Sequence, residues 1–253
     1  MSHTDAIRDQ FTYQAAAYAS AQPIRNEEIL NRIVAACDPH ADDTVLDVAC
    51  GPGILTCALA AKAKHATGID LTPAMLDQAR KLQREHNLAN LTWLEGDVTH
   101  LPFADATFSL VVCRYAFHHF PDPLIVLREM KRVCAKNGRI VVVDTAPAKE
   151  KEAAFNRMEK LRDNSHVRAL PVEEMLHLFA QAGLREAKAE TLRMAGDLNS
   201  LLARSFCQAG DEARCRALYE QALTDDVIDM QPHRDGDNIL YAFPVAIYVA
   251  VNS

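Results

Sequence analysis

Hydrophobic and polar positions follow two patterns along the first 146 residues. Short apolar runs bounded by turn residues predict strands at 44–48, 66–70, 91–95, 108–114 and 139–144. Apolar residues at helical spacing predict helices beside them, at 24–36, 54–64, 73–86 and 122–135. Strands that alternate with helices form a parallel sheet covered on both faces, so we expect an α/β fold.

The C-terminal part of the chain has a different organisation. Its predicted helices cover 149–161, 172–181 and a polar insertion at 197–226, and its predicted strands cover 184–194 and 239–251. Pro244 lies inside the last strand and has no N–H to donate, so we expect either a bulge there or ladder pairing that begins at or beyond Val245. No internal repeat or low-complexity linker interrupts the chain, which favours one domain with a small helical lid.

Composition and charge narrow the classes of function. The chain has 253 residues, of which 49% are hydrophobic, enough to bury a core at this size. The formal net charge is −7, which argues against extended nucleic-acid binding. No stretch is apolar enough for a signal or a membrane span, so we expect a cytoplasmic protein. The seven cysteines form no C-x-x-C pair and no metal-ligand cluster, so we expect free thiols and no metal.

The turn after the first predicted strand carries the first chemical signal. Gly51 and Gly53 allow a sharp turn and a close backbone approach to a ligand, and the next helix points free N–H groups at the same space. Dinucleotide-binding turns have a third glycine where this chain has Thr56. Asp47, just before the turn, would repel a pyrophosphate but attract the ammonium and sulfonium groups of S-adenosylmethionine (SAM). The pattern therefore favours SAM over NAD.

Two further acids lie at or just beyond the next two strands. Asp70 can accept hydrogen bonds from ribose hydroxyls, a role that SAM and NAD sites share. Asp97 can accept a hydrogen bond from an adenine amine, while the Val98 N–H donates to a ring nitrogen. Asp97 alternatively caps only the loop that follows it. The spacing of the acids is that expected of a nucleoside site.

With a D-x-A-x-G-x-G turn at 47–53, then Asp70, Asp97 and the segment 108–120, the chain resembles the class I SAM-dependent methyltransferases over 40–146. It is most similar to the bacterial small-molecule branch that includes ubiquinone/menaquinone C-methyltransferase-like proteins. The resemblance implies a Rossmann-like seven-stranded sheet of order 3214576 whose last strand is antiparallel. We divide the single domain, 1–253, into an N-terminal lid and helix (1–36), a SAM-binding core (40–146), an acceptor-side cap (149–238) and a final strand (239–251).

The same resemblance implies a set of residues around the cofactor. They are Asp47, Cys50, Gly51 and the turn-shaping Gly53 for the methionine part, Asp70, Leu71 and nearby Met75 for the ribose, and Asp97 and Val98 for the adenine. Arg114 and Tyr115 would line the face where the methyl group is transferred. Phe11, Tyr13 and Tyr18 resemble a lid over the cofactor.

The histidine pair His118-His119 follows the fourth strand, at the edge of the sheet where ligands bind. Since the methyl group of SAM is already activated, the protein mainly supplies alignment, and a base where the acceptor must lose a proton. One histidine is the candidate base, unless both only order the loop. Asp144 either faces the acceptor or caps a loop. The polar segment 162–168 either contacts an acceptor or, more ordinarily, is a solvated helix connection.

The leading hypothesis is an enzyme that moves the methyl group of SAM to C, N or O of a small metabolite. The segment 113–116 lacks both the Asn/Asp-Pro-Pro-aromatic turn and the Pro-Cys nucleophile of enzymes that methylate macromolecules. An NAD-dependent oxidoreductase and a SAM-binding protein without catalysis are the alternatives. The expected partner is a small methyl acceptor, with no nucleic acid and no membrane, in a monomer or homodimer.

Overall fold

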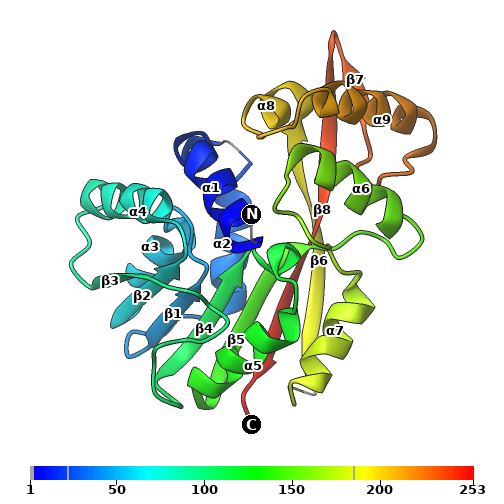
Figure 1. The fold of residues 1–253 in the computed structure, drawn as a ribbon. Coiled ribbons are helices and arrows are strands. Elements are labelled where there is room, and N and C mark those ends of the chain that lie inside the picture. Colours follow the sequence, from blue (N-terminus) through cyan, green and yellow to red (C-terminus); the bar gives the residue numbers. More distant parts are fainter. Residues whose placement is uncertain (1–2, 22, 185) are drawn as a thin grey trace.

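The computed structural model describes residues 3–21, 23–184 and 186–253. A central sheet carries helices on both faces, and further helices stand over one end of it (Figure 1). The strands are β1 (Thr44–Val48), β2 (His65–Asp70), β3 (Leu91–Glu95), β4 (Phe108–Arg114), β5 (Cys134–Thr145), β6 (Lys188–Asp197), β7 (His233–Asp235) and β8 (Asn238–Val251). The helices are α1 (His3–Ser20), α2 (Glu27–Cys37), α3 (Ile54–Ala60), α4 (Pro73–Glu85), α5 (Pro123–Val133), α6 (Glu152–Arg162), α7 (Val172–Gln181), α8 (Leu198–Ala203), α9 (Asp211–Asp225) and the 3-10 turn η1 (Phe117–His119).

The sheet has the expected strand order. Its sequence of neighbours is β3-β2-β1-β4-β5-β8-β6, with the short β7 paired to β8 as an additional strand. Strands β1 to β5 pair in parallel, and β8 is antiparallel to both β5 and β6. The predicted order 3214576 is confirmed once β7 is recognised as an extra hairpin strand.

Pro244 is accommodated by the difference between the two edges of β8. Toward β5 the ladder begins at the pair Thr145–Val245, as predicted. Toward β6, however, the prediction is wrong, because pairing continues through Pro244 to Leu240. The Pro244 carbonyl accepts a hydrogen bond from Ala146 N at 3.1 Å on the β5 side. In an antiparallel strand the N–H and C=O of one residue point to the same side, so the missing N–H of Pro244 would also face β5. The β5 ladder has already ended there, and no hydrogen bond to β6 is lost.

Several predicted boundaries differ from the structure; for example, the helix predicted at 54–64 ends at Ala60. The helix predicted at 122–135 ends at Val133, and β5 follows at once. The polar insertion at 197–226 contains two helices, because Gly210 adopts φ 86 and begins α9 separately from α8. The strand predicted at 184–194 lies slightly further along the chain, as β6. These shifts leave the element order unchanged.

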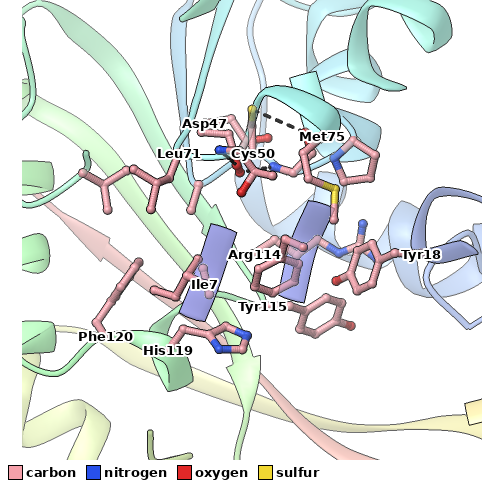
Figure 2. A pocket seen from close by; sticks show the side chains of 18 of the residues that line it. Ile7, Tyr18, Asp47, Cys50, Leu71, Met75, Arg114, Tyr115, His119 and Phe120 are labelled. Atoms are coloured by element: carbon pink, nitrogen blue, oxygen red, sulfur yellow. Dashed lines mark hydrogen bonds between the residues drawn. The ribbon is translucent and has the colours of Figure 1, made fainter. Parts of the chain in front are cut away.

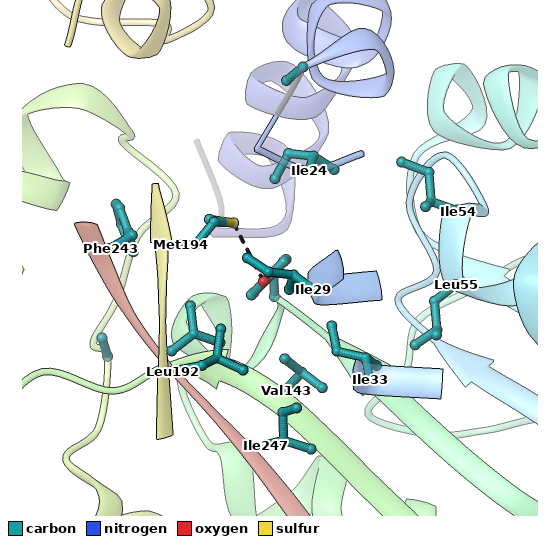
Figure 3. Close-up of a cluster of buried hydrophobic side chains, with 14 of the residues drawn as sticks. Ile24, Ile29, Ile33, Ile54, Leu55, Val143, Leu192, Met194, Phe243 and Ile247 are labelled. Carbon is teal, nitrogen blue, oxygen red and sulfur yellow. Dashed lines mark hydrogen bonds between the residues drawn. The ribbon is translucent and has the colours of Figure 1, made fainter. Parts of the chain in front are cut away.

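Both faces of the sheet are buried. Alternate residues of β5 belong to different clusters: Val141 and Val143 pack with residues of α2, α3 and the cap, whereas Ile140 and Val142 pack with α5 and α7. Figure 3 shows Val143 beside Ile33 of α2 in the first cluster. The continuous apolar strands of the sequence reflect this double burial.

The cap stands on long extensions of β6 and β8 beyond the carboxyl end of the parallel strands. Helices α6, α8 and α9 surround these extensions, and α1 lies between the cap and α4 (Figure 1). Across the described ranges, no helix is both long and apolar enough to cross a membrane. All seven cysteines fall within these ranges, and each is a free thiol.

Candidate functional site

The two glycines of the turn after β1 have different tasks. Gly51 (φ 53) would place an added Cβ in open space, with no heavy atom within 4 Å. Gly53 (φ 75) would place a Cβ 2.6 Å from a ring carbon of Trp93 and 2.9 Å from Cβ of Ala79. Gly51 therefore leaves room for a ligand, whereas Gly53 lets the first turn of α3 pack against α4 and β3.

A cavity of about 250 Å³ lies at the carboxyl ends of β1, β2 and β4 and beneath α1. It brings together twelve of the predicted site residues: Tyr18, Asp47, Cys50, Gly51, Asp70, Leu71, Met75, Asp97, Val98, Arg114, Tyr115 and His119. Figure 2 shows Asp47, Cys50 and Met75 on one side of the space and Tyr115 and His119 on the other. Gly53 and His118 are not among its lining residues.

Asp47 carries a buried carboxylate oxygen with no partner. The residue is 1% exposed, and its Oδ2 accepts a hydrogen bond from Thr56 Oγ1 at 2.6 Å. Its Oδ1 has no hydrogen-bond partner among the described residues. Burial raises the pKa of Asp47 to about 7. Such an oxygen beside a cavity is suited to a ligand cation, and Thr56, where dinucleotide-binding turns have glycine, positions the carboxylate.

Asp70 ties the first turn to the second. Its Oδ2 accepts from the N–H of Gly51 at 2.8 Å, and its Oδ1 accepts from the N–H of Thr72 at 2.9 Å. Burial raises the pKa of this carboxyl. Each oxygen retains a second lone pair, so the carboxylate can still accept bonds from a ligand that bears two hydroxyls.

Asp97 caps the loop that follows it. Its Oδ1 accepts from the N–H and the hydroxyl of Thr99, each at 2.8 Å, so it does cap the loop. It also lines the cavity, together with the buried Val98.

Arg114 and Tyr115 join the sheet to the N-terminal segment. The Arg114 guanidinium donates to the carbonyl of Ile24 at 2.7 Å and lies 4.7 Å from the centre of the Tyr115 ring. Tyr115 has a positive φ of 56, an uncommon conformation for a bulky residue, and its N–H donates to Val143 O. The strained backbone turns this ring into the space between β4 and α1.

Helix α1 forms the roof of the cavity. His3, Ile7, Phe11 and Tyr18 line it from this helix. Tyr13 does not: it is 64% exposed and stacks on Phe206, with ring centroids 4.5 Å apart. Of the three predicted lid residues, Phe11 and Tyr18 line the cavity, whereas Tyr13 links α1 to the loop after α8. The sequence did not point to Ile7, because the apolar residues of α1 do not gather on one face of the helix.

His118 is held by Asp144. Its Nδ1 lies 2.5 Å from Asp144 Oδ1, and its backbone N–H donates to Asp144 Oδ2 at 3.0 Å. Burial lowers the pKa of His118, but the Asp144 carboxylate outweighs burial and the net direction is upward. Asp144 therefore anchors the η1 loop through two bonds.

His119 belongs to a second network. Its Nδ1 lies 3.1 Å from Ser165 Oγ, and Ser165 Oγ donates to Asp163 Oδ1 at 2.6 Å. Ser165 is 0% and the adjacent His166 1% exposed. The expectation that 162–168 is a solvated connection is therefore wrong for these residues, because their polar groups bond to one another and to η1.

A smaller chamber of about 70 Å³ adjoins the cavity on the cap side. Five residues line both spaces: Phe11, Tyr18, Ile24, Tyr115 and His119. The rest of the chamber is lined by Gln14 of α1, by His118 of η1 and, from the cap and strand ends, by Thr145, Arg162, Asp163, Met194, Leu201, Arg204, Tyr241 and Phe243. The chamber residues that belong to the cap lie in the C-terminal part of the chain, where the sequence has the fewest recognisable motifs.

Comparison with known proteins agrees with this geometry. Residues 46–142 match the methyltransferase domain family. The chain is 30% identical over 172 residues to the uncharacterized methyltransferase YcgJ of Bacillus subtilis, covering 67% of this chain and 68% of that protein. The chain therefore belongs to the SAM-dependent methyltransferases, and SAM is its methyl donor.

Two solved structures share the fold, and a further protein is similar in sequence. The crystal structure of YcgJ has a TM-score of 0.82 at 24% identity, covering 89% of this chain and 98% of that one. The demethylmenaquinone methyltransferase of Lactobacillus johnsonii is 36% identical over 110 residues, 42% of this chain and 45% of that protein. Haemonchus contortus phosphoethanolamine N-methyltransferase 2, solved with phosphomonomethylethanolamine and S-adenosylhomocysteine, has a TM-score of 0.73 at 14% identity, covering 99% and 60%.

Proposed function

We propose that this methyltransferase acts on a small molecule. The observation that carries the proposal is the size and position of the chamber beside the cofactor cavity: about 70 Å³, roofed by α1 and closed on one side by the cap. A small acceptor fits such a space, whereas a nucleic-acid or protein acceptor needs an open approach. The small-molecule acceptors in the names of the two relatives, a demethylmenaquinone and a phosphoethanolamine, support the same class.

The residues of the cavity suit the parts of SAM. The free Oδ1 of Asp47 would take the ammonium, Asp70 and Leu71 the ribose, with Met75 nearby, and Asp97 with Val98 the adenine. Open space at Gly51 and the thiol of Cys50 would border the methionine part. SAM supplies an already activated methyl group, so the protein's main tasks are alignment and the exclusion of water. Tyr18, Arg114 and Tyr115 would perform both at the junction of the two spaces.

A labelling experiment tests the acceptor class. The protein is incubated with [methyl-³H]SAM and a bacterial cell extract that has been separated into low-mass and macromolecular fractions. We expect label only in the low-mass fraction. Label in protein, RNA or DNA would contradict the proposal. Because all seven cysteines are free thiols, we also propose that the protein works in the reducing cytoplasm, as a monomer or homodimer.

A further inference from the structure

His119 stands where the two cavities meet. It lines both the cofactor cavity and the cap-side chamber, while His118 lines only the chamber. Figure 2 shows its imidazole on the opposite side of the space from Asp47 and near Tyr115. A methyl group that passes from the cofactor to an acceptor must cross this junction, so a base for the acceptor belongs here.

The hydrogen bonds of the cap determine the tautomer of His119. Ser165 has one hydroxyl proton and donates it to Asp163 Oδ1, which also accepts the Ser165 N–H at 2.8 Å. Ser165 Oγ must therefore accept the remaining bond, from a proton on His119 Nδ1. In a neutral imidazole this leaves Nε2 with a lone pair, and no hydrogen bond within the described part of the chain uses that atom.

The charges around the ring favour the neutral form. Burial, followed by the neighbouring His118, lowers the pKa of His119. His118 lies with its ring centroid 4.1 Å away, and His166 lies 6.5 Å away. Asp163 opposes them through Ser165. Burial raises the pKa of Asp163, but His119, Arg162 and the hydrogen bonds from Ser165 outweigh burial, so the net direction is downward. The imidazole is thus a free base before reaction, with an anion placed to stabilise the charge it gains.

A second unsatisfied group points to a ligand in the chamber. Thr145 is 6% exposed and lines the chamber, and its hydroxyl has no partner among the described residues. Buried hydroxyls are normally hydrogen-bonded, so this atom is available to a polar acceptor. Aromatic rings of Phe11, Tyr115 and Phe243 cover much of the remaining wall.

We propose that the cap-side chamber holds a small acceptor whose reacting atom carries an O–H or N–H, and that Nε2 of His119 takes this proton while Ser165 and Asp163 position the ring. The inference rests on the small-molecule function proposed above. The O–H or N–H bond breaks, its electron pair forms the new bond to the methyl carbon, and its proton bonds to Nε2. The electron pair of the S–CH₃ bond stays on sulfur, which becomes a neutral thioether, and the imidazolium later returns its proton to water.

The positioning network has a readout that needs no acceptor. Two-bond ¹H–¹⁵N NMR of protein labelled at histidine reports which ring nitrogen carries the proton. At neutral pH we expect His119 to carry it on Nδ1, and we expect Ser165→Ala to shift the population toward Nε2–H. A proton on Nε2 in the unaltered protein, or an unchanged tautomer in Ser165→Ala, would overturn the assignment.

The chemical class is tested with [methyl-¹³C]SAM and the low-mass extract fraction. The ¹³C shift of the transferred methyl group separates O–CH₃ and N–CH₃ from C–CH₃. An O- or N-methyl signal supports the inference, and a C-methyl signal overturns it while leaving the small-molecule proposal intact. Labelling confined to the macromolecular fraction, or no transferred methyl at all, overturns both proposals.

Variants complete the test on the same reaction. His119→Gln should lower turnover by about 10²–10⁴-fold, the usual contribution of a general base, and Ser165→Ala by about tenfold. His177→Gln, at an exposed position on α7, is the matched control and should keep full turnover. Thermal unfolding of each variant shows whether it folds. Wild-type turnover in a folded His119→Gln protein would remove His119 from the mechanism.

Discussion

The cofactor half and the acceptor half of the site differ in how they are built. Apart from Tyr18 of α1, the residues expected to hold SAM lie between β1 and the loop after β4, where each strand of the parallel sheet ends at the same edge. The acceptor chamber is assembled from α1, η1, α6, β6 and β8, which lie far apart in the sequence. In the cofactor half, each parallel strand places the residues at its carboxyl end at the same edge of the sheet. The acceptor half depends instead on packing between elements that are distant in the sequence. The two halves therefore respond differently to substitution.

Asp47→Asn should have the largest effect on the cofactor half. It removes the charge but keeps an oxygen for Thr56, so SAM affinity should fall by about 2–5 kcal/mol, the loss typical of a buried charge pair. The protein without SAM should be no less stable, because an unpaired buried carboxylate is costly. Isothermal calorimetry and thermal unfolding measure the two quantities. Asp42→Asn, on the exposed surface nearby, is the control. A SAM Kd within threefold of wild type would refute the role of Asp47.

Gly53→Ala tests whether the second glycine acts through packing. The new Cβ would meet Trp93 and Ala79 at a positive φ, so we expect a loss of unfolding free energy of about 2–4 kcal/mol from overpacking and backbone strain. Chemical denaturation measures the loss. Gly51→Ala has the same backbone strain without the clash. It should lower the free energy of SAM binding by more than it lowers the free energy of unfolding. Equal destabilisation by both variants would contradict this division of tasks.

The pH dependence of SAM binding should follow Asp47. Its pKa is about 7, so the carboxylate is protonated below that pH and ionised above it. Binding of the SAM ammonium requires the ionised form, so affinity should be constant above the pKa and fall by up to about tenfold per pH unit below it. Calorimetry between pH 5.5 and 8.5 tests this. In Asp47→Asn the SAM affinity should no longer depend on pH. A pH dependence that persists in this variant would come from another titratable group.

The contact between lid and cap should have the smallest effect. Tyr13 and Phe206 are both exposed, so their stacking should contribute about 0.5 kcal/mol or less beyond the area it covers. Alanine at either position should speed the release of S-adenosylhomocysteine by a factor of about two, and the double variant should add little. Stopped-flow dissociation measures these rates. Unchanged release in all three variants would mean that α1 closes without this contact.

Much of the fold was predictable because its signals are local. The bounds of β1, β3 and β4 match the predicted strands residue for residue, since each is a short apolar run between turn residues, largely buried in β1 and β4 and half-exposed at the sheet edge in β3. Asp122 caps α5 as its position before Pro123 suggests, accepting from the N–H of Leu124 at 3.1 Å. The paths of β6 and β8 were less predictable, because pairing partners decide where such strands begin. Pro244 illustrates this, since its missing N–H faces β5, beyond the end of that ladder, while pairing with β6 continues through it.

The sequence by itself determined the class of enzyme, its methyl donor and the order of its strands. Acids and glycines at strand ends converge whenever the strands are parallel, so their spacing alone predicts a shared site. Only the tertiary structure decided that His119 rather than His118 reaches the cofactor cavity, and that Ser165 and Asp163 lie behind it. Adjacent side chains point in different directions, and the partners here are distant in sequence: Ser165 is 46 residues from His119, and Asp144 is 26 residues from His118. No local pattern encodes such a contact, because it depends on how the cap packs onto the sheet.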